Sequence, residues 1–231
     1  MNYVKTTATE SSFVSTVFLW MFAALGITAL TAYLFASTPE LTLMMISPET
    51  ASINLFGWIV MLAPIIIVFV MSARVEKMSV QTMTILYVVY SILMGMSLSF
   101  IFFAYTDASI MKTFAICSAM FGIMALVGYT TKTDLTKFGG ILMMALIGVI
   151  VASLVNFFMH SERLDYIISF VGVLIFTGLT AYDVQKIKEI GNNGIAQGDT
   201  MAKMTIFAAL SLYLDFINLF LYLLRFFGKR D

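Results

Sequence analysis

Charged side chains are scarce in this chain of 231 residues: they make up 11% of it, whereas hydrophobic residues make up 61%. A soluble domain has about 25% charged and about 45–50% apolar residues, so the composition excludes a soluble protein. The mean hydropathy of +0.97 agrees with this exclusion. Basic and acidic residues number 13 each, and this zero net charge gives no reason to expect nucleic acid as a partner.

Cysteine and histidine each occur only once. Cys117 lies inside an apolar run, so it cannot form a disulfide within the chain and is expected to be a packing residue. His160 falls between two apolar runs, where a solvated loop residue is expected and a metal site is not. The chain also lacks the alternating polarity of a transmembrane β-barrel and any connection long enough for a second domain. One helical bundle is therefore predicted over residues 1–231.

Seven apolar runs are each long enough to cross a hydrocarbon core of about 30 Å as a helix. They are Phe13–Ala36, Ile53–Ala73, Thr82–Tyr105, Ile110–Tyr129, Phe138–Met159, Tyr166–Tyr182 and Met204–Phe227. The predicted fold class is an all-α integral membrane protein with seven transmembrane helices. The first run is too long for a signal peptide, so we expect an uncleaved anchor that follows a short cytoplasmic segment, residues 1–12.

The distribution of Lys and Arg favours a cytoplasmic N-terminus, because basic residues accumulate in cytoplasmic loops. The cytoplasmic segments would then contain Lys5, Arg74, Lys77, Lys132, Lys137, Lys186, Lys188 and Lys203. The outer loops would contain Lys112 and Arg163, with Arg225, Lys229 and Arg230 in the C-terminal tail. Either the seventh span places a short basic tail outside, or the last segment is re-entrant and both ends are cytoplasmic.

Small residues at a spacing of four predict close helix packing in two of the runs. They are Ser91, Gly95 and Ser99 in the third run, and Ser118 and Gly122 in the fourth. Asn156 in the fifth run is expected to form a hydrogen bond across helices.

Asp215 stands near the middle of the last apolar run. A carboxylate at the centre of a span costs roughly 2.5–3.5 kcal/mol, so it is a candidate functional residue that needs a partner. Polar residues recur along this run at spacings of three and four, namely Ser211, Asp215, Asn218, Tyr222 and Arg225. This spacing places them on one helix face, which we expect to face the bundle interior or an aqueous cavity.

Asp183, at the end of the sixth run, is the nearest candidate partner in the sequence, and Thr177 and Thr180 precede it at a spacing of three. Two ionised carboxylates are unfavourable together in a poorly hydrated interior, so the pair would share one proton and titrate as a unit. When deprotonated it would offer the hard oxygen ligands that Ca²⁺ prefers, although two carboxylates cannot fill six to eight coordination positions.

The predicted depths of the two acids disagree. Asp183 lies roughly 26 Å along its span, near the cytoplasmic boundary, whereas Asp215 lies roughly 16 Å from that side. Contact requires the seventh helix to begin outside the hydrocarbon or the sixth to sit deeper; the alternative is two acids that are satisfied separately. Arg74, at the predicted cytoplasmic end of the second run, is either a countercharge for the pair or an ordinary topology signal.

Two segments around these acids resemble the signature segments of the Bax inhibitor-1 family, the transmembrane Bax inhibitor motif proteins. They are Tyr182-Asp183-Val-Gln185-Lys-Ile187 and Leu212-Tyr-Leu-Asp215-Phe-Ile-Asn218. The segments Arg74–Ser79, Tyr90–Ser99 and Gly128–Leu135 look like those of bacterial members. Position 184 is Val where Thr is frequent in the family, which is a minor departure.

The resemblance implies seven helices with the last one enclosed by the other six. It also implies a pH-sensitive Ca²⁺ leak channel in which Asp183 and Asp215 sense protons and Arg74 engages the pair to help close the pore. The supporting polar residues would be Ser211, Asn218, Tyr222 and Thr180. No cofactor is expected, and the partners would be Ca²⁺, protons and the lipid bilayer.

The resemblance also bears on location and physiological role. Animal members suppress cell death from the endoplasmic reticulum, and some bacterial members associate with a membrane-bound AAA protease. We therefore expect the inner (plasma) membrane, or the endoplasmic reticulum if the chain is eukaryotic.

Other functions use related residue patterns. An intramembrane aspartyl protease has an Asp on each of two spans, but its Gly-x-Gly-Asp motif and its Pro-Ala-Leu segment are missing here. A retinal receptor needs a lysine in mid-span, and none is present. We therefore do not expect an enzyme. A non-conducting regulator of a membrane-bound AAA protease or of a cell-death or stress response remains an alternative, and a proton-coupled exchanger would use the same two acids.

Overall fold

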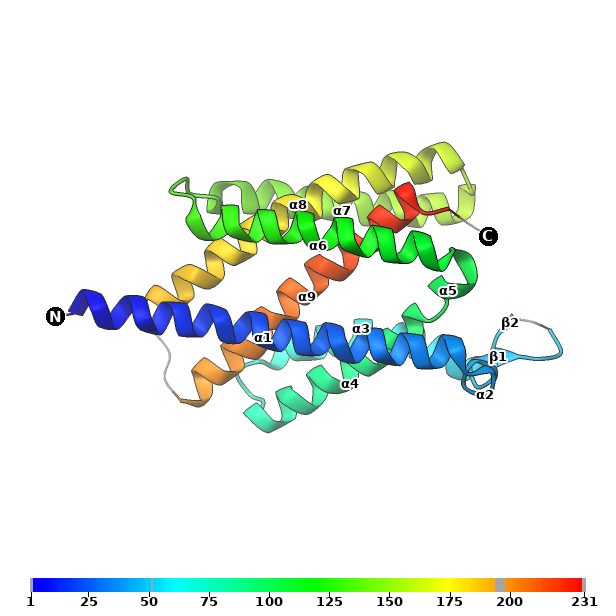
Figure 1. Cartoon of the computed structure of the whole chain (residues 1–231), viewed down its shortest axis with the longest axis horizontal. Helices are drawn as coiled ribbons and strands as arrows, with labels where there is room; N and C mark the ends of the chain where they lie inside the picture. The colour runs from blue at the N-terminus through cyan, green and yellow to red at the C-terminus, as the bar shows by residue number, and fades with distance from the viewer. Residues whose placement is uncertain (1, 51, 194–197, 230–231) are drawn as a thin grey trace. The chain divides into compact units, whose positions relative to one another are not determined.

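The computed structural model describes residues 2–50, 52–193 and 198–229, which form helices and one short hairpin (Figure 1). The helices are α1 (Asn2–Ser37), α2 (Pro39–Leu43), α3 (Leu55–Arg74), α4 (Val80–Leu98), α5 (Ile101–Ala104), α6 (Asp107–Thr130), α7 (Thr136–Met159), α8 (Glu162–Asn193) and α9 (Asp199–Phe227). The hairpin pairs β1 (Ile46–Ser47) antiparallel with β2 (Ser52–Ile53). Arg230 of the predicted basic tail lies outside the described residues.

Seven helical stretches are long and apolar enough to cross a membrane, which confirms the predicted fold class. They are Ser11–Ser37, Leu55–Arg74, Val80–Ala104, Asp107–Thr130, Thr136–Met159, Glu162–Asn192 and Asp199–Phe227. The last stretch is one uninterrupted helix, which favours a seventh span over a re-entrant segment. The enclosure of this helix by the other six stays a prediction.

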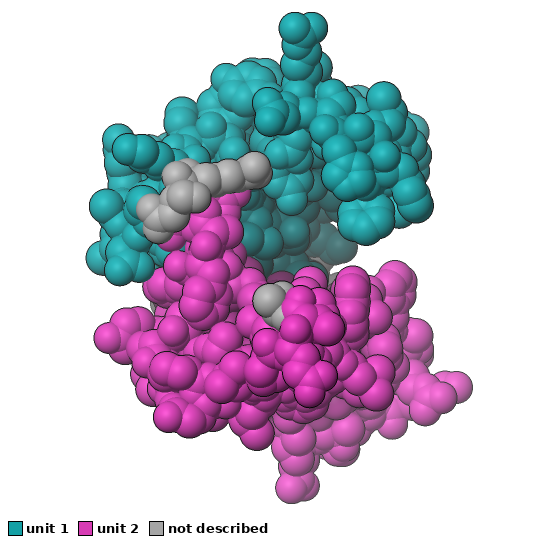
Figure 2. All heavy atoms as spheres, turned by 90° about the vertical axis from the view of Figure 1, so that its right-hand side faces the viewer, with its two compact units in different colours: residues 1–14, 106–194, 211–230 teal, residues 15–105, 195–210, 231 magenta. Residues whose placement is uncertain are grey.

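The chain divides into two compact units (Figure 2). Unit 1 consists of Met1–Val14, Thr106–Gly194 and Ser211–Arg230, and it contains α6, α7, α8 and the C-terminal part of α9. Unit 2 consists of Ser15–Tyr105 and Ile195–Leu210, with Asp231, and it contains most of α1, the hairpin, and helices α2 to α5.

In unit 2, α1 and α4 approach closely at the predicted run of small residues. A Cβ atom on Gly95 would lie 2.6 Å from the carbonyl oxygen of Thr28. The Oγ1 hydroxyl of Thr28 donates a hydrogen bond to the carbonyl oxygen of Ser91 at 2.9 Å. Tyr87, one turn earlier on α4, donates from its hydroxyl to the carbonyl oxygen of Trp20 at 3.3 Å. The spacing of small residues therefore predicted a real helix contact here.

In unit 1, glycines bring α8 against both α6 and α7. A Cβ atom on Gly128 of α6 would overlap the backbone of Ala181 on α8. A Cβ atom on Gly139 of α7 would lie 2.7 Å from the ring of Tyr182. Gly122, by contrast, has open space around its Cα, so the prediction of close packing at Ser118 and Gly122 is wrong. The four-residue spacing is present, but no described residue lies within 4 Å of the Cβ position of Gly122.

The turn between α7 and α8 is shorter than the sequence suggested, because α8 begins at Glu162 rather than at Tyr166. His160 ends α7 with a φ of 52°, in the left-handed region, and its side chain is exposed as expected. The Oδ1 atom of Asn156 accepts a hydrogen bond from the N–H of Ser161 at 3.0 Å. The expected bond of Asn156 across helices is therefore replaced by a local bond that closes this turn.

Substitution of Gly95 by Ala should destabilise the protein by about 1–3 kcal/mol, because the added methyl group meets backbone that cannot move aside cheaply. Gly26→Ala on α1 is the matched control, since nothing lies within 4 Å of its Cβ position. It should be neutral or stabilising by up to about 1 kcal/mol. Thermal unfolding of the detergent-purified variants measures both effects, and equal melting temperatures would contradict the close contact.

Candidate functional site

Asp215 is buried in α9 of unit 1, with only 5% of its surface exposed. Its Oδ2 atom is fully buried and accepts no hydrogen bond from any donor among the described residues. A buried ionised carboxylate without a partner is costly, so a second polar group must account for it.

That group is the carboxyl of Asp183 on α8. The carboxyl groups of the two residues lie within hydrogen-bonding reach of each other. Two carboxyl groups can form such a bond only when one of them carries a proton, because an ionised carboxylate has no donor. The structure thus brings together the two acids that the sequence singled out.

The predicted depth mismatch is corrected by the lengths of the two helices. α8 continues past the predicted end at Tyr182 to Asn193, and α9 begins at Asp199 rather than at Met204. Beyond Tyr182 the helix is amphipathic, with Val184 and Ile187 buried and Lys186 exposed, so a search for continuous apolar runs ends too early. Asp183 consequently lies inside its helix and not at its end.

Lys186, on α8 itself, is the basic residue that acts on Asp183. No cluster of three or more His, Cys, Asp or Glu side chains that could hold a metal ion occurs within the described part of the chain. Two carboxylates fall short of the six to eight oxygen ligands of a resident Ca²⁺, so the pair is not assigned as a metal site.

The other members of the predicted polar stripe of α9 are less buried than expected. Ser211, Asn218 and Tyr222 are half-buried and Arg225 is exposed, while Leu212, Leu219 and Leu223, on the adjoining face about 100° around the helix, are buried completely. The interior of the protein therefore receives the leucine face of α9 together with Asp215. Asp215 is the one member of this polar stripe whose side chain is buried.

Two of the supporting polar residues are satisfied within their own helices. The amide nitrogen of Asn218 donates to the carbonyl oxygen of Leu214 at 2.8 Å, and Thr180 donates to the carbonyl oxygen of Phe176 at the same distance. Tyr222 instead packs on α8: its ring stacks on that of Phe176 with centroids 5.8 Å apart. Gly172 leaves the room for this ring, since a Cβ atom there would lie 2.7 Å from it.

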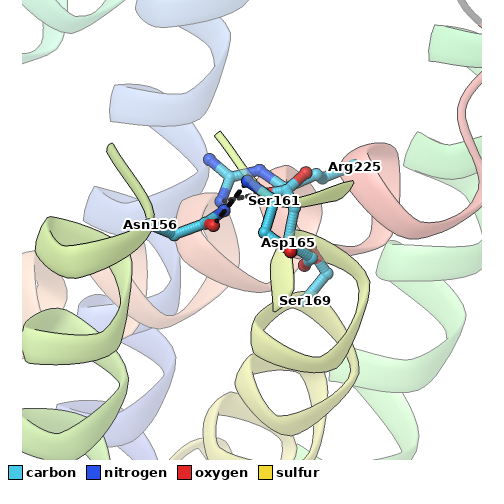
Figure 3. A network of polar contacts seen from close by, with 5 residues as sticks. All are labelled: Asn156, Ser161, Asp165, Ser169 and Arg225. Atoms are coloured by element: carbon cyan, nitrogen blue, oxygen red, sulfur yellow. Dashed lines mark hydrogen bonds and ion pairs between the residues drawn. The ribbon is translucent and has the colours of Figure 1, made fainter. Parts of the chain in front are cut away.

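A second polar group lies where α8 begins and α9 ends (Figure 3). Arg225 approaches Asp165 with an Nη1–Oδ1 distance of 3.3 Å, and the two side chains are 40% and 31% exposed. A pocket of about 410 Å³ opens beside this ion pair. Its lining consists of Ser153, Asn156, Phe157, His160, Ser161, Glu162, Asp165, Ile168 and Arg225.

Arg74 is the last residue of α3, in unit 2, and its side chain is exposed. Its assignment as the countercharge of the aspartyl pair stays a prediction.

Comparison with known proteins gives the same family as the two signature segments. A family model described as "Inhibitor of apoptosis-promoting Bax1" matches residues 10–231. Inner membrane protein YbhL of Escherichia coli is 45% identical over 231 residues, which cover 99% of this chain and 96% of that protein. The chain belongs to the Bax inhibitor family. Protein RP147 of Rickettsia prowazekii is 49% identical over 179 residues, covering 76% of this chain and 74% of the relative.

Membership of the Bax inhibitor family agrees with the predicted location. The name of the Escherichia coli relative places that protein in the inner membrane, and this chain has seven helices that can span a membrane. The protein is a multi-pass protein of the inner membrane.

The sequence did not predict the partner of Arg225. The missed signal is the pairing of helix ends: Asp165 lies in the first turn of α8 and Arg225 in the last turn of α9. Acidic residues at helix N-termini and basic residues at C-termini are favoured by the helix dipoles, and successive antiparallel spans bring such ends together. Gln185 lies within the first signature segment, and its hydrogen bonds to Thr133 and Leu135 were not predicted either.

The Arg225–Asp165 pair should stabilise the protein only slightly, because both groups are partly exposed to solvent. In a double-mutant cycle of Asp165→Asn and Arg225→Gln, we expect a coupling of about 0.2–1 kcal/mol in thermal unfolding. A parallel cycle of Asp165→Asn with Lys112→Gln should be additive. Additivity in the first cycle, or equal coupling in both, would contradict a specific ion pair.

Proposed function

We propose that this protein is a pH-sensitive calcium leak channel in which Asp183 and Asp215 sense protons. The observation that carries the proposal is the direct contact of two carboxyl groups from different spans, one of them buried in its helix. Intramembrane acids are costly and mark ion or proton pathways, so a paired arrangement of this kind supports a role in conduction or sensing.

The pair supplies a two-state element. With one proton shared, the carboxyl groups attract each other and hold α8 and α9 together at this point. With the proton lost, two negative charges repel in a poorly hydrated site and attract cations. Ca²⁺ is the transported ion in this proposal. It would contact the acids only in passing, and water or carbonyl oxygens would complete its coordination shell.

Arg74 is the countercharge of the closed state in this proposal. Its support is the resemblance of the Arg74–Ser79 segment to bacterial family members and its predicted cytoplasmic position. Arg74 would be attracted by the single negative charge that the pair keeps while its two carboxyl groups share one proton.

The alternative is a regulatory membrane protein that conducts nothing and modulates a membrane-bound AAA protease or a cell-death or stress response. The family description favours it, since "Inhibitor of apoptosis-promoting Bax1" names an effect on another protein. Calcium flux into liposomes that contain the purified protein separates the two functions. Absence of flux at every pH, from protein shown to be folded, would leave the regulator.

Substitution of Asp215 by Asn should abolish or strongly weaken the pH dependence of Ca²⁺ flux, because an amide keeps the shape of the carboxyl group but does not titrate. Asp107→Asn is the matched control, since Asp107 is an exposed acid in the first turn of α6. Flux through liposomes over a series of pH values measures the effect. An unchanged pH response of the Asp215 variant would overturn its role as sensor.

The double variant Asp183→Asn with Asp215→Asn should change the pH response little more than the stronger single variant does. Once one acid is gone, the other has no proton to share, and interacting sites give non-additive effects. The three variants are compared as flux against pH in one lipid composition. Additive shifts would show two independent acids and refute a shared proton.

A further inference from the structure

The segment of α8 that carries Asp183 is tied to α6, α7 and the loop between them. Ala181 lies against Gly128 of α6, and Tyr182 lies against Gly139 of α7. Further along, the Nζ of Lys188 donates to the carbonyl oxygen of Tyr129 at 2.8 Å. All of these residues belong to unit 1.

Gln185 makes the most specific of these contacts, because both the nitrogen and the oxygen of its side-chain amide form hydrogen bonds. The Nε2 atom donates to the carbonyl oxygen of Thr133 at 2.8 Å, and Oε1 accepts the N–H of Leu135 at 2.7 Å. The side chain is buried, with 7% exposed. An aliphatic side chain would make neither bond, and a carboxylate could not donate the first one.

The loop that Gln185 holds has hydrogen bonds of its own. Asp134 accepts a hydrogen bond from the N–H of Thr136 at 2.9 Å, and hydrogen bonds from Thr136 keep the pKa of Asp134 below its usual value. The Oγ1 atom of Thr131 accepts the N–H of Thr133 at 3.2 Å. The amide of Gln185 is thus attached to a defined turn.

Helix geometry relates this anchor to the aspartyl pair. An α-helix turns about 100° per residue, so side chains two positions apart point about 200° away from each other. Gln185 binds the loop on one side of α8, while Asp183 meets Asp215 of α9 on the other. The hydrogen bonds of Gln185 oppose rotation of α8 about its axis. They therefore fix the direction of Asp183 on the other side of the helix.

We infer that Gln185 is a positioning residue for the aspartyl pair: it ties α8 to Thr133 and Leu135 and thereby holds the carboxyl group of Asp183 against that of Asp215. The charged groups that act on Asp183 are Asp215, from α9, and Lys186, from α8 itself. Gln185 changes neither charge; it sets the geometry in which the two acids meet. Only the flux readout of this inference rests on the proposed channel function.

Two variants test the anchor from its two ends. Gln185→Met keeps the length of the side chain and removes both hydrogen bonds. Leu135→Pro removes the N–H that Gln185 accepts, together with the half-buried leucine side chain, at a φ of −81° that lies close to the value proline imposes. Gln81→Met, at an exposed position of α4, is the matched control.

The primary readout is the pH midpoint at which the paired carboxyl groups release their proton, measured by infrared spectroscopy on liposome-embedded protein with labelled aspartate. We expect both variants to shift this midpoint in the same direction by about one pH unit, and the control to leave it in place. Amide hydrogen exchange in the loop of residues 131–135 should quicken in both variants, and the flux profile should follow the midpoint. If only one of the two variants folds, the pH midpoint of that variant alone tests the inference.

An unchanged midpoint in a folded variant would overturn the inference, even if the loop exchanges faster, because Gln185 would then hold the loop alone. A shift of the same size in Gln81→Met would also overturn it. A wild-type protein that shows the infrared titration but passes no Ca²⁺ would refute the channel and leave the positioning role of Gln185 intact.

Discussion

Hydrocarbon offers a carboxyl group no partner, so an acid in the middle of a span must find one within the protein. Asp215 finds it in Asp183, and this contact sets conditions on the helices around it. α8 and α9 must both continue well beyond their acids, and α8 must present Asp183 toward α9. The helix bounds and the ties of α8 within unit 1 meet these conditions.

Side-chain size decides how closely the helices of unit 1 approach. Gly172 leaves room for the ring of Tyr222, so the C-terminal part of α9 lies directly on α8 there. The neighbour of Asp215 in the chain, Phe216, packs with its ring 5.4 Å from that of Phe121 on α6. α9 is therefore held by aromatic contacts to α6 and α8, and its acid is placed by this packing as well as by its partner.

The seven spans and the two acids could be predicted from the sequence because their signals are local: a continuous apolar run, and a carboxylate within or next to one. The end of α8 could not be predicted, because beyond Tyr182 exposed Lys186 alternates with buried residues and interrupts the run. The spacing of small residues also gave a wrong prediction where close packing depends on a neighbouring helix. Gly95 and Gly122 stand in the same pattern, but only the Cβ position of Gly95 has α1 against it. No described residue lies within 4 Å of the Cβ position of Gly122.

The contacts that hold α8 to α6 and its loop differ in kind from those that hold it to α9, and this difference bears on how the two acids could separate. Gly128 and Gln185 bind this part of α8 to α6 and to the loop that precedes α7, through backbone contact and two hydrogen bonds. Turning α8 away from α9 would break both bonds, and the buried amide of Gln185 would lose its partners. Aromatic contacts such as that of Tyr222 on Phe176 lose less when they slide, since dispersion is not directional. Separation of the carboxyl groups by a movement of α9 over a fixed α8 is therefore the less costly route.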